Sequence, residues 1–318
     1  FPIDISYPLC YNLIMIQRIS LLILMILLLS PLDVTAGERG KKVATTAYPS
    51  LKIGVGARAC GMGEAFTALS DDASAVYWNP AGLAQLHKSE LIAAHNDWFS
   101  DINHEFIAYA HPLNENTGLG IGAILLSIDD LERRTAPTIE PEGRFTAADT
   151  ILVYSLASKL KKKILIGGSI KLITQRIESN ESDSLAFDLG TLYRINDSTT
   201  LGIVLQNIGY QSNDFPLPLW LKIGIGYNLP QNHLKAASDI TLYKDNDPTY
   251  SAGIEYSVEK AGFLRLGYRK KSSEPSEGIL SGVTLGAGFR ILNSKIDYGY
   301  VPHDELGNSH NISLILRF

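Results

Sequence analysis

The second part of the chain has a repeating pattern of apolar and polar positions. From about residue 88 onward, segments near ten residues long alternate between the two kinds of residue and are separated by turn-forming clusters. In one segment, apolar positions 250, 252, 254, 256 and 258 interleave with the polar or small positions 251, 253, 255, 257 and 259, and segments 221–228, 295–300 and 311–318 behave alike. A period of two predicts β-strands, each with one apolar and one polar face.

The connections between these segments alternate in length. The longer ones lie near 97–102, 129–148, 176–183, 209–216, 244–249, 269–280 and 302–309, and the shorter ones at 113–117, 159–163, 196–199, 229–234, 259–262 and 293–294. Short periplasmic turns and longer external loops are typical of outer-membrane barrels. The pattern therefore predicts an all-β protein, a transmembrane antiparallel β-barrel of about 14 strands over residues 87–318.

Charged residues on the polar faces predict how two hairpins pair. Around the turn at Lys260, Glu255 is expected opposite Arg265, and a two-residue turn at 293–294 puts Arg290 opposite Asp297. Oppositely charged residues that face each other across antiparallel strands stabilise a register. We therefore expect these four residues to form lumen charge pairs with a structural role.

Residues 37–86 lack the alternation and are expected to form a small N-terminal hatch, or plug, inside the lumen. Small residues are frequent from about residue 43 to 86, as close packing inside a wall requires. A short helix is expected at 64–69, with Asp71 or Asp72 capping the next turn and Pro80 ending it. The glycines lack the Lys-Ser/Thr step of a nucleotide-binding loop.

The N-terminal 36 residues are expected to be a signal-peptide region. Translation is expected to start at Met15, Arg18 precedes the apolar run 19–29, and Val34-Thr35-Ala36 is a small-residue cleavage site, with cleavage after Ala36. An uncleaved anchor is the alternative. We make no structural prediction for residues 1–14.

Composition and spacing give no indication of catalysis. The formal net charge of -5 does not suggest nucleic-acid binding, and no cofactor or metal motif is present. The seven histidines occur singly and are expected to be solvated rim residues; they are His87, His95, His104, His111, His233, His303 and His310. The sequence therefore favours a non-enzyme in contact with outer-membrane lipid.

Two stretches, LKIGVGARACGMGEAF at 51–66 and DASAVYWNPAGL at 72–83, resemble the N-terminal signature of the PorV/PorQ family, relatives of the FadL-type long-chain fatty acid transporters. The resemblance implies a fourteen-stranded outer-membrane barrel with a hatch in its lumen. It directs attention to the hatch motif Asn79, Pro80, Ala81 and Gly82 and to the glycine-rich segment with Gly54, Gly56, Arg58, Gly61 and Gly63.

Two functions are compatible with this resemblance. The first is passive transport of small hydrophobic molecules, in which Arg58, Asp71 and Asp72 tether the hatch to lumen charges such as Arg265, Glu255 or Lys222. The second is a non-transporting component, or cargo-binding partner, of a type IX-like protein secretion system. The signature does not separate a hydrophobic ligand from secretion-system proteins as partners.

Overall fold

The computed structural model describes residues 46–98, 102–137, 139–211, 215–259, 261–272, 282–303 and 307–318. The expected signal peptide at 1–36 and the first residues of the expected hatch, 37–45, lie outside the described residues.

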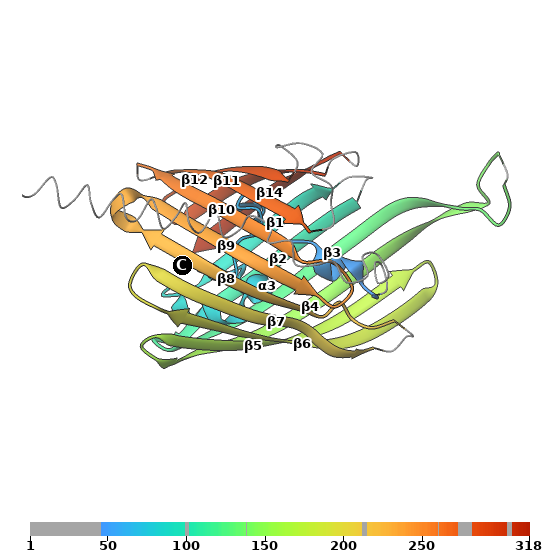
Figure 1. Ribbon diagram of the computed structural model, residues 1–318. Coiled ribbons are helices and arrows are strands. Elements are labelled where there is room, and N and C mark those ends of the chain that lie inside the picture. The colour runs from blue at the N-terminus through green and yellow to red at the C-terminus, as the bar shows by residue number, and fades with distance from the viewer. Residues whose placement is uncertain are drawn as a thin grey trace, which may run out of the picture. The chain divides into compact units, whose positions relative to one another are not determined.

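Fourteen antiparallel strands form a closed barrel, in which each strand pairs with its neighbours in the sequence and β1 pairs with β14 (Figure 1). The strands are β1 (Glu90–Trp98), β2 (Ile102–Asn114), β3 (Thr117–Arg133), β4 (Gly143–Lys161), β5 (Ile164–Ile177), β6 (Asn180–Arg194), β7 (Thr199–Gln211), β8 (Trp220–Leu229), β9 (Leu234–Tyr243), β10 (Thr249–Val258), β11 (Gly262–Lys271), β12 (Val283–Ile291), β13 (Ser294–Pro302) and β14 (Asn308–Arg317). The predicted fold class and strand number are confirmed.

The alternation positions the two faces of the wall as expected. In β10, Ser251 and Glu255 are buried on the luminal side, whereas Tyr256 is 48% exposed on the outside. Large apolar side chains are exposed on the outer face all around the barrel. A closed barrel pairs every strand edge, which is what the hydrocarbon core of a bilayer demands of a sheet. Among the described residues, no helix is both long and apolar enough to cross a membrane.

Two of the predicted loops are shorter than expected. β5 and β6 are joined by a tight turn at 178–179, because Arg176 pairs with Glu181 inside the ladder, so a long connection at 176–183 is wrong. β3 continues to Arg133 and β4 begins at Gly143, so the loop at 129–148 is too wide. In both places the strands carry charged, exposed residues, which resemble a loop because no apolar face is required there.

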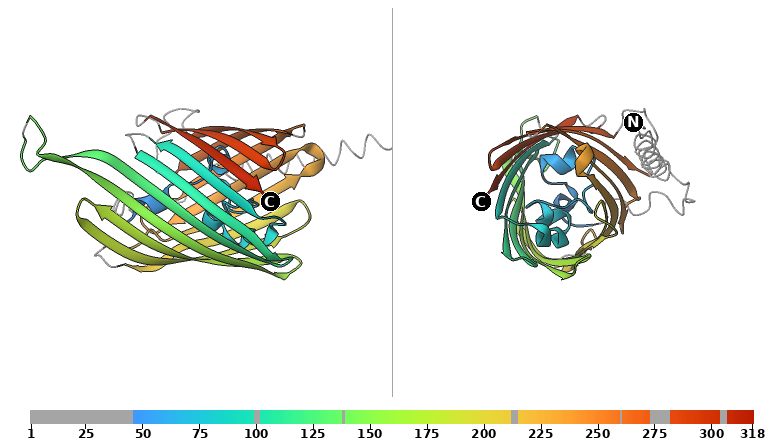
Figure 2. Two further views of the ribbon diagram at one scale, coloured as in Figure 1. Left: turned by 180° about the vertical axis from the view of Figure 1, so that it is seen from behind. Right: turned by 90° about the vertical axis from the view of Figure 1, so that its left-hand side faces the viewer.

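The lumen is occupied by residues 46–86, here called the plug (Figure 2). It contains two single-turn helices, α2 (Ala57–Cys60) and α3 (Ala75–Trp78), and two 3-10 turns, η1 (Pro49–Lys52) and η2 (Pro80–Gln85). A third 3-10 turn, η3 (Pro230–Asn232), lies between β8 and β9. The helix expected at 64–69 is wrong, since this segment forms turns and Glu64 has a φ of 64°.

The luminal wall has two chemically different parts. The inward residues of β1–β5 are largely apolar, and we call this part the apolar wall; its buried members include Ile92, Phe106, Ile124, Ile151 and Ile173. The inward residues of β9–β14 are mostly polar or charged and form the polar wall, with Asp239, Glu255, Arg265, Asp297 and Ser313 buried. A large hydrophobic cluster of the described residues joins the plug mainly to the apolar wall.

Candidate functional site: the plug and its anchors

Asn79 anchors the plug through its side chain. Its Oδ1 accepts a hydrogen bond from the Ala81 amide at 3.2 Å and so caps η2, and its Nδ2 donates to the carbonyls of Thr67 at 2.9 Å and Thr191 at 3.3 Å. Asn79 is completely buried, so each of these bonds satisfies a polar atom that water cannot reach. One amide therefore ties together two parts of the plug and strand β6.

The hatch motif packs directly on wall backbone. A Cβ added to Gly190 in β6 would lie 2.1 Å from the Asn79 Oδ1, and one added to Gly167 in β5 would lie 2.5 Å from the Ala81 nitrogen and from the Pro80 carbonyl carbon. Gly82 lies against the plug itself, with a Cβ there 2.0 Å from the Ser70 carbonyl oxygen. Asn79, Pro80 and Ala81 are thus in contacts that only glycine in the wall permits, and Gly82 allows the same close approach within the plug.

The glycine-rich segment packs in a similar way on the polar wall. A Cβ on Gly61 would lie 2.9 Å from the Cα of Gly286. A Cβ on Gly54 would collide with Glu64 and Trp78, which belong to the plug itself. Gly56 and Gly63 have φ angles of 81° and 64°, in the region that glycine adopts most readily.

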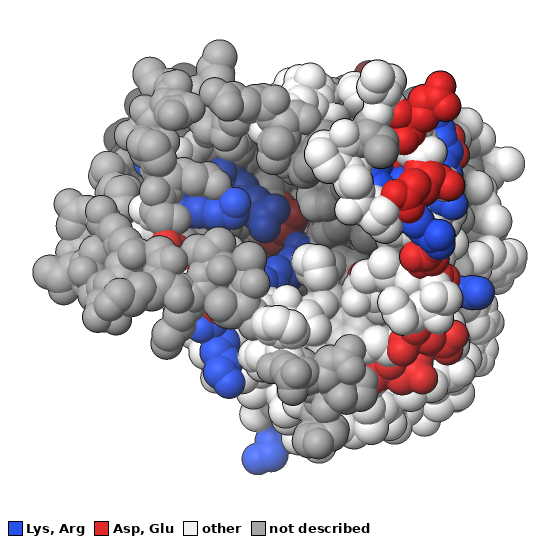
Figure 3. Space-filling view, turned by 90° about the vertical axis from the view of Figure 1, so that its right-hand side faces the viewer, with Lys and Arg blue, Asp and Glu red and all other residues white. Residues whose placement is uncertain are grey.

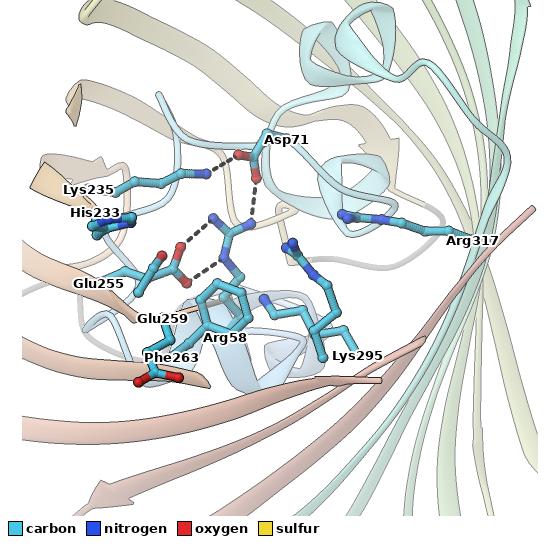
Figure 4. A pocket seen from close by; sticks show the side chains of 11 residues that line it. Arg58, Asp71, His233, Lys235, Glu255, Glu259, Phe263, Lys295 and Arg317 are labelled. Atoms are coloured by element: carbon cyan, nitrogen blue, oxygen red, sulfur yellow. Dashed lines mark hydrogen bonds and ion pairs between the residues drawn. The ribbon is translucent and has the colours of Figure 1, made fainter. Parts of the chain in front are cut away.

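Arg58 is the charged centre of the plug. Its Nε and Nη2 donate to the two carboxylate oxygens of Glu255 on β10 at 2.9 and 3.0 Å, and its Nη1 donates to Asp72 at 2.9 Å and to Asp71. Asp71 also accepts from Lys235 of β9 at 2.6 Å (Figure 4). The expected tether of Arg58, Asp71 and Asp72 to the lumen charge Glu255 is therefore present, with Lys235 as a further partner.

Electrostatics keep this cluster ionised. Burial opposes the charge of Asp71, but Arg58 and Lys235 outweigh it and hold the pKa of this carboxyl well below its ordinary value. Burial likewise disfavours the charged form of Arg58, whereas Asp71, Glu255 and Asp72 raise its pKa. A bidentate guanidinium–carboxylate pair is among the stronger polar contacts in proteins.

The charges of the wall itself follow one prediction and contradict another. Glu255 faces Arg265 in register, and the Arg265 Nε lies 2.7 Å from the Glu255 Oε2, so this pair is confirmed. Arg290 does not face Asp297: it faces Lys295, while Asp297 faces Gly288 and pairs with Arg265 at 2.8 Å. The prediction is wrong because the turn lies at 292–293, which moves the register by two residues.

At the opposite end of the lumen, near the longer connections, the first plug residues make polar contacts. Ser50 donates to Asp149 at 2.5 Å, the Tyr48 hydroxyl lies 2.8 Å from that of Ser182, and Lys52 pairs with Asp245. The surface at this end is hollowed, and Lys and Arg side chains line part of the hollow (Figure 3). The plug is thus fixed at both ends of the barrel.

Two wall residues contact the plug in ways that the sequence analysis did not predict. Asp239 of β9 accepts hydrogen bonds from the backbone nitrogens of Phe66 and Thr67 at 3.0 and 2.9 Å. Lys222, expected as a tether partner, instead places its Nζ 4.5 Å from the Trp78 ring and 4.7 Å from the Trp220 ring. A polar residue on an inward face marks the lumen, but the alternation does not say which plug atom it meets.

The histidines follow the expected rim position with one correction. His104 is 1% exposed on the inward face of β2, so it is a buried wall residue and not a solvated one. Within the described ranges, no group of three or more His, Cys, Asp or Glu side chains is arranged to hold a metal ion.

These features define a class of protein. A closed barrel of fourteen strands, apolar outside and filled by a plug, is an outer-membrane β-barrel of a bacterial cell.

Relatives in sequence give the family. The profile of the family described as "Uncharacterised protein family (UPF0164)" matches residues 30–184. A UPF0164 protein of Treponema pallidum (strain Nichols) is 35% identical over an alignment that covers 89% of this chain and 71% of that protein. The chain belongs to the UPF0164 family.

Solved structures show the same fold. The CymD monoaromatic hydrocarbon channel superimposes with a TM-score of 0.63 at 15% identity, covering 83% of this chain and 98% of that one. The toluene transporter TodX of Pseudomonas putida gives 0.61 at 14% (83% and 97%), and a FadL homologue of Pseudomonas aeruginosa gives 0.53 at 13% (81% and 97%). The barrel therefore shares its fold with these channels. The finer resemblance to PorV/PorQ stays a prediction.

Proposed function

We propose that this protein lets small hydrophobic molecules cross the outer membrane passively, between the plug and the apolar wall. The observation that carries the proposal is a continuous apolar contact on one side of the lumen. Buried aliphatic and aromatic side chains of β1–β5 pack against apolar side chains of the plug, although buried polar residues such as His104, Asp149 and Lys171 interrupt this wall. A water-filled pore for polar solutes has a polar interior instead. The likeness in fold to channels named for monoaromatic hydrocarbons and toluene supports the same direction.

In this proposal the plug is the barrier to permeation, and its contacts with the wall decide where a molecule passes. The hatch motif, including Asn79 and Pro80, keeps the plug on the glycines of β5 and β6, while Arg58, Asp71 and Asp72 hold it on the polar wall. Passage requires the apolar contacts to separate, because apolar side chains in van der Waals contact leave no room for a ligand.

The test is uptake of labelled toluene by intact Gram-negative cells that express the chain, compared with cells that express it with Val153→Thr and Ile124→Thr. Both side chains are fully buried in the apolar wall, so hydroxyls there disfavour an apolar ligand. Ser251→Ala on the polar wall is the matched control. We expect uptake to rise with the wild-type chain, to fall in the double variant and to be unchanged in the control; equal uptake with and without the chain contradicts the proposal.

The alternative role in a type IX-like secretion system has its own test. Crosslinking in intact cells that recovers exported cargo or a stable multi-protein complex, together with no toluene uptake, favours secretion over transport.

A further inference from the structure

A cavity of about 400 Å³ lies at the short-turn end of the barrel, between the plug and strands β9–β14 (Figure 4). Its lining is densely charged, and the residues that matter here are Arg58, Asp71, Glu255, Arg290, Lys295 and Arg317. The first three belong to the plug anchor already described. The last three come from β12, β13 and β14, which are adjacent strands.

The positive charges of these three residues exceed the negative charge that pairs with them, chiefly because of Arg290 and Lys295. Arg290 and Lys295 face each other directly in register, an arrangement of like charges that destabilises a sheet. Throughout the described part of the chain, Arg290 has no carboxylate within ion-pair distance. Lys295 has Asp297 at 3.3 Å, but that carboxylate is held more closely by Arg265 at 2.8 Å.

The other neighbours do not supply the missing negative charge. Arg317 pairs with Glu90 at 2.7 Å, which leaves that carboxylate occupied. Glu259 also lines the cavity but points away from Lys295 (Figure 4). The Phe263 ring lies 5.1 Å from the Arg290 guanidinium carbon and 4.6 Å from the Lys295 Nζ. A ring attracts cations without neutralising them, so it gathers these two positive charges on one side of the cavity.

We propose that Arg290, Lys295 and Arg317 bind the phosphate group of a ligand at this mouth of the barrel. Two guanidinium groups and an ammonium are the donors that phosphate oxygens accept best, and the planar guanidinium suits two oxygens at once. An anion bound between β12 and β13 offsets the repulsion between the facing Arg290 and Lys295. Because Arg58 and Glu255 line the same cavity, a ligand here contacts the charged anchor of the plug.

The phosphate group can come from a free phosphate compound or from a phospholipid headgroup, and the experiment separates these sources. The full chain, purified in a non-ionic detergent and freed of lipid, is titrated with inorganic phosphate and followed by ³¹P NMR line width. In parallel, protein taken from phosphatidylglycerol vesicles is weighed by native mass spectrometry for retained lipid. Binding in the first arm indicates free phosphate, and lipid retained in the second indicates a headgroup.

The variant is Arg290→Gln with Lys295→Gln, and the matched control is Lys159→Gln, an exposed lysine at the same end of the barrel that donates to the Glu115 carbonyl. We expect phosphate or lipid binding at least about tenfold weaker in the double variant, because two charge-assisted hydrogen bonds to the phosphate oxygens are lost. The control is expected to bind as wild type does. If the double variant does not fold, Arg290→Gln alone takes its place and is expected to bind more weakly than the control, whereas Arg290→Lys, which keeps the charge, is expected to retain most of the binding.

The proposal is overturned if neither arm detects binding to the wild-type chain, or if the double variant binds as tightly as the control. It does not depend on the proposed transport function, because a chain that binds phosphate here without taking up toluene leaves this site intact.

Discussion

The apolar wall and the polar wall hold the same plug by different chemistry. On the β1–β5 side the contact is apolar packing, and the hatch motif fits wall glycines so closely that the Gly167 position has no room for a Cβ. On the β9–β14 side the plug is held by the ion pairs of Arg58 and Asp71 and by the hydrogen bonds of Asp239. Tight packing tolerates no change in volume, whereas ion pairs beside a cavity can exchange partners with water or ligand. The contact with the apolar wall is therefore expected to be sensitive to changes in side-chain volume, and the contact with the polar wall to changes in charge.

The largest expected effect is at the polar wall, with Arg58→Ala. It removes the cation that pairs with Asp72, which is almost fully buried, and an uncompensated buried carboxylate costs about 3 kcal/mol or more. Glu255 loses the same cation but keeps Arg265. The melting temperature of the barrel measures this loss of stability. Arg144→Ala, in an exposed pair with Asp130, is the control and is expected to cost less than about 1 kcal/mol. Equal losses in the two variants contradict the importance of burial.

At the apolar wall, Gly167→Val tests the glycine contact. Its Cβ would meet Ala81 and Pro80, and overpacking of this kind costs about 1–3 kcal/mol. The neighbouring Gly168→Val is a matched control, since its Cβ has no atom closer than 3.5 Å. The melting temperature of Gly167→Val is expected to fall well below that of Gly168→Val, and the reverse order refutes the packing we describe.

A smaller effect is expected for Asn79→Ala, which removes the cap of η2 and the bonds to Thr67 and Thr191. We expect a loss of about 1–2 kcal/mol, because these buried carbonyls lose a donor. Asn196→Ala changes a similar turn amide in the exposed connection between β6 and β7. Limited proteolysis of the plug is expected to accelerate only in Asn79→Ala.

The smallest effect is the pH dependence of Asp71, one-third of whose side chain is exposed. Its folded pKa is depressed, so its contribution to stability is present above the unfolded pKa of about 4 and is lost as the pH falls through the folded value. At neutral pH, Asp71→Asn is expected to cost less than about 1 kcal/mol. Below about pH 4 the difference from wild type is expected to shrink. A difference that grows toward acid contradicts the depressed pKa.

The features that could be predicted from the sequence are those that depend on the local alternation of apolar and polar residues. Alternation gives the strands and their inward faces, and the short connection expected at 259–262 predicts the Glu255–Arg265 register that the two strands show. The partner of Arg290 was missed because the observed turn places Leu292 at a φ of 53°, a conformation that leucine rarely adopts and that turn preferences therefore argue against.

Contacts between plug and wall depend on residues far apart in the chain, so no local pattern reveals them. Asn79 meets Thr191 across more than a hundred residues, and Arg58 meets Glu255 across almost two hundred. The frequent glycines on the inward faces were the available signal: they indicate that backbone or side chains approach the wall closely. What they do not indicate is which part of the plug fills each position.

On the proposed route, the plug separates from the apolar wall when a hydrophobic molecule passes. A reversible crosslink between the two tests this movement directly. In a chain whose native cysteines are replaced, Val76→Cys and Gly122→Cys join the plug to β3 of the apolar wall. A Cβ on Gly122 would lie 3.1 Å from the Val76 Cγ1, which is the position that the cysteine sulfur takes. Toluene uptake by intact cells is then measured before and after reduction, with each single-cysteine variant as a control. We expect uptake to be blocked in the oxidised double variant and restored by reduction. Undiminished uptake through the crosslinked barrel contradicts it.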